Sequence, residues 1–219
     1  NLMKKIFPNF DFSKENFSHM SFKNADIDNV KCRVMRISFT GEMCYEINVP
    51  SSYAKALWEK CFEVGKQYEI TPYGTEAMHV LRAEKGFIIV GQETDGTVTP
   101  HDLGMSWIVS KNKNDFIGKR ALERNSMNDN SRKQLVGLVT INPNIVIPEG
   151  AHAILDKNQE LPYDMLGHVT SSYYSPNLGK SIALALLKNG TSLHGKTVWL
   201  PQINGNDPIE AKVTKSTFM

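Results

Sequence analysis

Alternating hydrophobic and polar positions predict a β-hairpin early in the chain. Residues 31–39 are rich in β-forming side chains, and the apolar residues expected to share one face are Met35, Ile37 and Phe39. Residues 40–43 supply the turn. In the next strand the apolar face is expected to hold Tyr45, Ile47 and Val49, and the polar face Cys44, Glu46 and Asn48. The hairpin therefore carries a carboxylate on its more polar side.

Apolar residues then recur at helical spacing in two segments. The first helix is expected to start at residues 50–52 and to stop at Gly65. The second is expected to begin at Thr75, which can cap its N-terminus, and to end at Gly86, with its inward side chains being Ala77, Met78 and Leu81. A short buried strand at 87–90, a loop at 91–106 and a short helix at 118–124 follow. Strands interleaved with packed helices indicate an α+β layer.

The pattern changes in the last third of the chain. Short β-rich runs separated by Pro, Gly and Asn occupy residues 134–141, 151–155, 168–174, 180–187, 197–200 and 209–214. Six such runs without an amphipathic helix predict a small antiparallel β-barrel or sandwich. The expected fold class is therefore α+β, an antiparallel sheet with packed helices followed by a small antiparallel β-barrel. The expected domains are 1–125 and 134–219, joined by a polar linker at 126–133.

Composition narrows the class of protein. The 219 residues are 41% hydrophobic and 22% charged, with a formal net charge of +2. Because the charge is spread evenly, we expect no nucleic-acid partner, and without a run of about 18 apolar residues we expect no membrane span. Three cysteines without a C-x-x-C pair favour a reducing, cytoplasmic location. Residue 1 is Asn rather than Met, so the chain is expected to be a piece of something longer.

Most candidate chemistry in the sequence has a plainer structural explanation. The six histidines show no metal-ligand spacing, and His79 is expected in a core or helix-surface role. His101 and Asp102 could form a catalytic pair, although an Asx-type turn is favoured about four to one. Residues 93–96 resemble half of a calcium loop but lack its remaining ligands. We therefore predict neither a metal site nor a nucleotide loop.

Glu46 is the carboxylate that needs an explanation. It lies between Tyr45 and Ile47 in a strand expected to pair closely, so it should sit at a sheet edge or line a cavity. A carboxylate there needs hydrogen-bond donors. One source is Arg82 on the second helix, which would make a structural ion pair and is favoured about two to one. The other is a ligand with two adjacent N–H groups, such as the amino-pyrimidinone edge of a pterin.

Four ordered strings of residues resemble the aminomethyltransferase, or glycine-cleavage T-protein, superfamily. They occupy residues 38–47 (SFTGEMCYEI), 74–86 (GTEAMHVLRAEKG), 91–97 (GQETDGT) and 115–122 (DFIGKRAL), with GHVTS at 167–171 and SP at 175–176. Within the superfamily, the second and third strings are most similar to the C-terminal region of the α subunits of heterotetrameric sarcosine oxidases. The resemblance covers roughly residues 30–215.

The resemblance implies a folate-binding region followed by a β-barrel, with three residues at the folate site. The Glu that holds the pterin falls on Glu46, and the aromatic that lines the pocket falls on Phe39, where Tyr is usual. The Arg expected near the folate glutamate tail or in the pocket wall falls on Arg82. No catalytic residue is expected in this chain, because the family's catalytic Asp lies well upstream of these strings.

Two departures from the glycine-cleavage pattern favour the oxidase branch. Met43 and Cys44 replace an acidic-Gly pair, and Met78 stands where those enzymes carry an Arg. In that branch the resemblance implies tetrahydrofolate in this region, which captures the one-carbon unit of sarcosine as 5,10-methylenetetrahydrofolate. FAD, FMN and NAD are implied elsewhere in the complete enzyme, and the implied partners are its β, γ and δ subunits.

Two alternatives stay open. The chain could belong to a folate-dependent aminomethyltransferase or a related demethylase. It could also be a non-catalytic subunit-contact region with a vestigial folate pocket. The isolated chain is expected to be inactive as a sarcosine oxidase.

Overall fold

The computed structural model describes residues 1–129, 131–203 and 205–219 and divides the chain into two compact units. Unit 1 is Asn1–Met78 and unit 2 is His79–Met219. Unit 1 combines helices with an antiparallel sheet, and unit 2 contains a six-stranded antiparallel barrel. The predicted α+β fold class with a C-terminal barrel is therefore confirmed.

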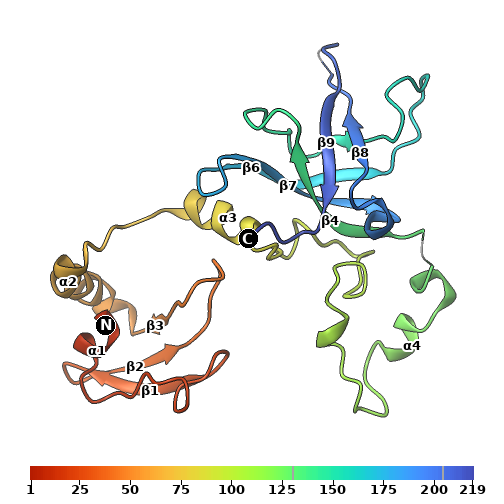
Figure 1. Cartoon of the computed structure of the whole chain (residues 1–219). Helices are drawn as coiled ribbons and strands as arrows, with labels where there is room; N and C mark the ends of the chain where they lie inside the picture. The colour runs from red at the N-terminus through yellow and green to blue at the C-terminus, as the bar shows by residue number, and fades with distance from the viewer. Residues whose placement is uncertain (130, 204) are drawn as a thin grey trace. The chain divides into compact units, whose positions relative to one another are not determined.

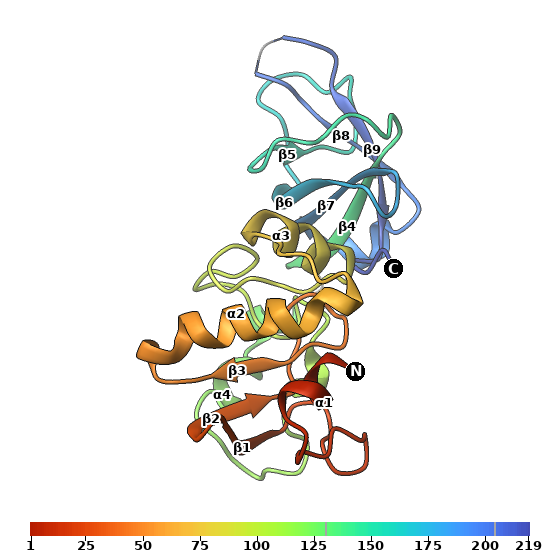
Figure 2. The ribbon, with the colours of Figure 1, turned by 90° about the vertical axis from the view of Figure 1, so that its left-hand side faces the viewer.

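Unit 1 is a three-stranded antiparallel sheet with helices packed on one face (Figure 1). The strands β1 (Phe22–Ile27), β2 (Val30–Met35) and β3 (Glu46–Asn48) follow α1 (Leu2–Ile6) and precede α2 (Ala54–Gly65). Short 3-10 turns flank α2 as η1 (Ser51–Tyr53) and η2 (Lys66–Tyr68). Figure 2 shows α2 running along β3. The core beneath the helices holds Phe7, Phe17, Cys32 and Val34, with Leu57 and Cys61 of α2 against it.

In unit 1 the predicted pairing of the hairpin strands is correct, but the side chains predicted to form the apolar face of the first strand are wrong. β2 pairs with β3 as expected, with Val34 opposite Ile47 and Met35 opposite Glu46. The buried side chains of β2 are Cys32 and Val34, whereas Phe39 lies beyond the strand. The expected apolar face of Met35, Ile37 and Phe39 is therefore wrong. Between residues 31 and 39, apolar side chains occur at both odd and even positions, so the sequence does not decide which face is buried. The aromatic cluster and α2 pack on the face that carries Val34, and this face is the buried one. The strand β1 was also not foreseen.

The second predicted helix is confirmed as α3 (Thr75–Glu84), but its buried side chains are different from those expected. Arg82, Ala83 and Glu84 are buried, and Ala77 is exposed. Residues 87–90 form no strand, with Phe87 43% and Val90 85% exposed. The backbone of this segment bonds instead to buried side chains, because Arg82 donates to the Phe87 carbonyl and Ile89 N donates to Glu93.

The barrel strands agree with the six predicted runs. They are β4 (Lys133–Thr140), β5 (His152–Ala153), β6 (Gly167–Ser175), β7 (Lys180–Lys188), β8 (Thr197–Leu200) and β9 (Ile209–Thr214), in the spatial order β5-β6-β7-β4-β9-β8. One bridge between Ile154 and Trp199 joins the two outer strands, so the barrel is nearly closed (Figure 1). Its core contains Val136, Leu138, Val169, Val198 and Val213.

Strand β7 is buried on both faces, which explains its continuous apolar run. Ala183 and Ala185 face the barrel core, while Leu184 and Leu186 pack outside it. The outer cover includes Ile88 and Val98, from the loop after α3, and Phe218 near the C-terminus. Shorter elements between α3 and β8 are α4 (Lys119–Leu122) and the 3-10 turns η3 (Ser106–Ile108), η4 (Asn125–Met127) and η5 (Gly190–Leu193). The predicted domain limits around 126–133 stay a prediction.

Candidate functional site

Glu46 lies on the exposed face of an edge strand. It begins β3, the outer strand of the sheet of unit 1, and its neighbours Tyr45 and Ile47 turn toward the core as predicted. The Glu46 side chain is exposed, and its Oε1 accepts a hydrogen bond of 2.9 Å from the Asn48 amide. The expected position at a sheet edge is therefore observed. Strand alternation separates the charge from the aromatic core on the other face.

Phe39 belongs to the loop that leads into β3. The loop is folded back on itself through the Cys44 sulfur, which lies 3.5 Å from the Ser38 hydroxyl and 3.4 Å from the Thr40 hydroxyl. Thr40 is buried, whereas the Phe39 ring is 43% exposed. Tyr45, at the end of the same loop, stacks on Phe17 with a centroid separation of 6.1 Å. These contacts fix both ends of the segment between Phe39 and Glu46.

The sheet face that carries Glu46 is polar and partly hollowed. Arg33 pairs with Asn48 across the strands and lies over the Phe22 ring at 4.7 Å. A shallow hollow of about 490 Å³ lies on the neighbouring part of the sheet, and its lining includes Asn24, Arg33 and Asn48 but not Glu46. The face therefore offers a cation and amide groups within one strand of the Glu46 carboxylate.

Arg82 is fully buried in a hydrogen-bonded cluster of unit 2. Its Nη1 donates to Glu93 Oε2 at 3.0 Å and to the Phe87 carbonyl at 3.0 Å. Its Nη2 donates to Ser171 Oγ at 2.6 Å and to the Tyr173 hydroxyl at 3.3 Å. Both members of the Arg82–Glu93 ion pair are 0% exposed. The partner of Arg82 is Glu93, so the ion pair with Glu46 that the sequence favoured is wrong.

Glu93 completes this cluster as an acceptor. Besides Arg82, it accepts hydrogen bonds from the Ile89 backbone N–H at 2.8 Å and from the Ser171 hydroxyl. Ser171 follows a register shift in β6, between Val169 and Ser171. The cluster therefore ties α3, the loop after it and β6 into one body. A buried charge is retained in a protein interior when it is paired in this way.

A second buried carboxylate on α3 bonds to the far end of β6. Glu84 is 1% exposed and accepts hydrogen bonds from the Ser175 hydroxyl and from the Asn177 amide. The sequence did not single out Glu84, and it singled out Glu93 only as the first residue of the half calcium loop. Both residues lie in the family strings at 74–86 and 91–97, and their partners Ser171 and Ser175 lie in the strand at 167–175. This pairing becomes visible only when the strand is placed beside α3.

His101 and Asp102 do not form a catalytic pair. Asp102 is buried and bonds to Thr99 and to Arg132, whose Nη2 lies 2.6 Å from Asp102 Oδ2, whereas the His101 ring bonds to the Ser106 hydroxyl. Burial alone would raise the pKa of Asp102, but hydrogen bonds from Arg132 and Thr99 outweigh it and lower the pKa below its usual value. Asp102 therefore anchors the loop to the start of the barrel.

The residues that the structure describes contain no group of three or more His, Cys, Asp or Glu side chains that could hold a metal ion. Glu93, the first residue of the half calcium loop, is occupied by the Arg82 cluster. Within the same described ranges, no helix is both long and apolar enough to cross a membrane.

Comparisons with known proteins identify the family. The model of the GCVT N-terminal domain matches residues 1–113, and that of the glycine cleavage T-protein C-terminal barrel domain matches residues 133–219. A sarcosine oxidase subunit alpha from Corynebacterium sp. strain P-1 is 47% identical over 207 residues, covering 93% of this chain and 21% of that protein. An aminomethyltransferase from Thermoanaerobacter pseudethanolicus is 34% identical over 195 residues, covering 89% of this chain and 50% of that protein.

A solved structure shares the fold. The crystal structure of glycine cleavage system aminomethyltransferase T from Bartonella henselae matches with a TM-score of 0.78 and 24% identity, covering 94% of this chain and 54% of that one. This chain thus spans between a fifth and about half of the length of these relatives. The two family models together match all of unit 1 and all of unit 2 except residues 114–132. The chain belongs to the glycine cleavage T-protein family and is similar to the aminomethyltransferase-like region of sarcosine oxidase α subunits.

Proposed function

We propose that this chain supplies part of a tetrahydrofolate site in an enzyme that oxidatively demethylates sarcosine. In that enzyme, folate captures the one-carbon unit as 5,10-methylenetetrahydrofolate. The observation that carries the proposal is the Glu46 carboxylate, held at an open strand edge inside the region matched by the GCVT N-terminal domain. The 47% identity to a sarcosine oxidase α subunit supports this branch over the aminomethyltransferases, which match at 34%.

The geometry of Glu46 suits a pterin ring. The amino-pyrimidinone edge of a pterin presents two adjacent N–H groups, and a carboxylate can accept both in parallel. Asn48 engages one oxygen of Glu46 and thereby orients the carboxylate, while the exposed side chain leaves room for further donors. Glu46 in this role orients the ring and does not act as the acid or base.

Phe39 would contribute an apolar ring surface to the same site. It is 43% exposed, and the Cys44 sulfur restrains the loop on which it lies. An aromatic side chain can stack on a flat heterocycle. Because this position carries Phe, it provides no hydroxyl to the ligand, and its contribution is limited to packing and exclusion of water.

Arg82 would have a positioning role within unit 2 rather than bind the folate tail. Its guanidinium is 0% exposed and already donates to Glu93, Ser171 and Tyr173. A ligand carboxylate could reach it only if this cluster opened, which would leave Glu93 buried without its partner. We therefore assign Arg82 to positioning the segment that contains Glu93.

The chemistry of the transfer would come from folate, whose nitrogens are the nucleophiles, while the protein binds and orients. FAD, FMN and NAD would act elsewhere in the complete cytoplasmic enzyme, together with β, γ and δ subunits. The chain spans 21% of the Corynebacterium α subunit, so by itself it should have no sarcosine oxidase activity.

One observation favours a second candidate, a subunit-contact role. Large apolar side chains are exposed in the segment between α3 and α4, with Trp107 at 77% and Ile117 at 105%. Large apolar side chains are enriched where proteins contact one another. This role would coexist with folate binding, or would replace it if the folate pocket is vestigial.

Titration calorimetry with tetrahydrofolate on the complete subunit tests the proposal. Charge-assisted hydrogen bonds contribute about 1.5–3 kcal/mol, so Glu46→Gln should weaken binding by about 10- to 100-fold. Glu59→Gln is the matched control, because Glu59 is an exposed glutamate of α2 in the same unit. Equal affinity for the wild type and Glu46→Gln would refute the role of Glu46. Absence of folate binding to the wild type would leave the contact role as the function.

A further inference from the structure

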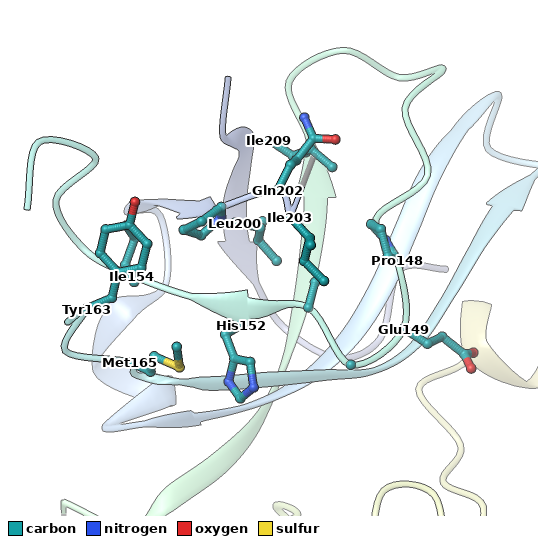
Figure 3. Close-up of a pocket in the computed structure, with 13 residues that line it drawn as sticks. Pro148, Glu149, His152, Ile154, Tyr163, Met165, Leu200, Gln202, Ile203 and Ile209 are labelled. Carbon is teal, nitrogen blue, oxygen red and sulfur yellow. The ribbon is translucent and has the colours of Figure 1, made fainter. Parts of the chain in front are cut away.

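The barrel contains a cavity that none of the three proposed folate residues lines. It has a volume of about 580 Å³ and lies where β5 and β8 meet (Figure 3). Ile154 and Leu200 line it from the two sides of this seam, and Ile209 lines it from the start of β9. The barrel is closed at this seam by one bridge, with Ile154 and Trp199 exchanging backbone hydrogen bonds of 2.9 and 3.0 Å.

The apolar wall of the cavity is already in place without a ligand. Ile154 is 1%, Leu200 0% and Ile209 7% exposed, and the latter two belong to the barrel core. Side chains packed into a core keep their positions, because interiors are close-packed. A ligand would lie on top of this packed layer and contact the accessible lining, which includes Met165 and Ile203, without rearranging the barrel.

The polar side chains that line the cavity are Glu149, His152, Tyr163 and Gln202. Tyr163 stands at one end, and Gln202 lies near Ile209, where its amide nitrogen donates to the Asp207 carbonyl at 2.7 Å (Figure 3). The Glu149 carboxylate extends away from the apolar group and accepts a hydrogen bond of 3.3 Å from Gln92. The cavity thus offers a mostly apolar surface with some hydrogen-bonding groups, and the negative charge at its border points elsewhere.

We propose that this cavity is a second small-molecule site, for a neutral and mainly apolar molecule that carries one or two hydrogen-bonding groups. The volume falls in the range of about 300–1,000 Å³ that is typical of small-molecule sites, which combine apolar walls with a few polar groups. A charged ligand is disfavoured, because its desolvation would be costly against a lining that is mostly apolar. The site is independent of the folate proposal.

Methyl NMR of methionine-labelled protein tests this site with 2-naphthol, a neutral bicyclic ring with one hydroxyl. Met165 lines the cavity, so its methyl signal, assigned with Met165→Leu, reports ring currents from a bound aromatic probe. We expect a saturable shift of the Met165 signal and no shift of the exposed Met20 and Met43, which lie in unit 1. Naphthalene-2-sulfonate, the charged analogue, should leave the Met165 signal unchanged.

Two isoleucines provide a matched pair of variants. Ile203 lines the cavity and is 108% exposed, whereas Ile117 is 105% exposed and does not line it. Both positions should accept a larger side chain without loss of folding. Ile203→Trp places an indole at the cavity and should weaken 2-naphthol binding at least tenfold, and Ile117→Trp should leave binding unchanged.

Three outcomes would overturn the proposal. A Met165 shift that rises linearly without saturation would mean that the cavity holds no site. Equal binding by Ile203→Trp and the wild type would place the probe elsewhere. A dimer in sedimentation velocity that Ile203→Trp dissociates would mean that a second copy of this chain covers the cavity. None of these results depends on folate binding.

Discussion

The buried Arg82–Glu93 pair gives the sharpest test of the barrel unit. Glu93→Gln keeps the shape of the side chain but removes its charge, which leaves the Arg82 guanidinium buried without a counter-charge. Glu93 accepts hydrogen bonds from Arg82, Ile89 and Ser171, and both charged side chains are 0% exposed. Breaking such a pair from one side costs about 3–5 kcal/mol. For a chain of this length that loss lowers Tm by roughly 6–20 °C.

Removing both charges should recover part of the loss. Arg82→Met alone leaves the Glu93 carboxylate unpaired, whereas Arg82→Met with Glu93→Gln leaves no buried charge. The Arg82 Nε–H is itself buried with no hydrogen-bond partner among the described residues, so the wild-type pair is imperfectly compensated. We expect the loss of unfolding free energy in the double variant to be about 1–3 kcal/mol smaller than the sum of the two single-variant losses.

Urea unfolding measures these free energies. With Trp58 and Trp107 replaced by Phe, the remaining Trp199 on β8 reports on the barrel. Asp164→Asn is the control, because the Asp164–Lys188 pair of the same unit is exposed and exposed pairs contribute little. Additive losses in the single and double variants would refute the coupling, and a Glu93→Gln midpoint equal to that of Asp164→Asn would refute the buried-charge argument.

Three further predictions concern other parts of the structure. The folded pKa of Asp102 lies below its unfolded value, so its stabilisation is complete above about pH 4 and disappears as pH falls through the folded pKa; the difference in unfolding free energy between wild type and Asp102→Asn should therefore shrink only in acid. Gly167→Ala would place a Cβ 1.9 Å from the Leu186 carbonyl oxygen, and chemical denaturation should show a loss of about 1–3 kcal/mol or more, whereas Gly96→Ala, which meets no neighbouring atom within 4 Å and needs no positive φ, should leave the stability nearly unchanged. Burial raises the pKa of the Cys32 thiol, so iodoacetamide at pH 8 should alkylate it far more slowly in the folded protein than in urea, and equal rates would contradict its burial.

Local sequence patterns determined most of the barrel. Each of its six strands is a short β-rich run bounded by Gly, Pro or Asn, and these signals act over a few residues, so they can be recognised without knowing the partner strand. The sequence also predicts the helices α2 and α3, because apolar residues at helical spacing are likewise a local signal. The alternation of Tyr45, Glu46 and Ile47 also placed the carboxylate on the polar face of its strand.

Tertiary structure alone decided which residues the buried charges contact. The run at 87–90 has the hydrophobicity of a strand, yet its Phe87 carbonyl and Ile89 N–H bond to Arg82 and Glu93 instead of to a neighbouring strand. The preferred ion pair between Glu46 and Arg82 was wrong for a related reason. The partners of Arg82 are 11 and 89 residues away along the chain, at Glu93 and Ser171. Periodicity specifies which face a side chain occupies, but the burial and pairing of a charge depend on segments that only folding brings together.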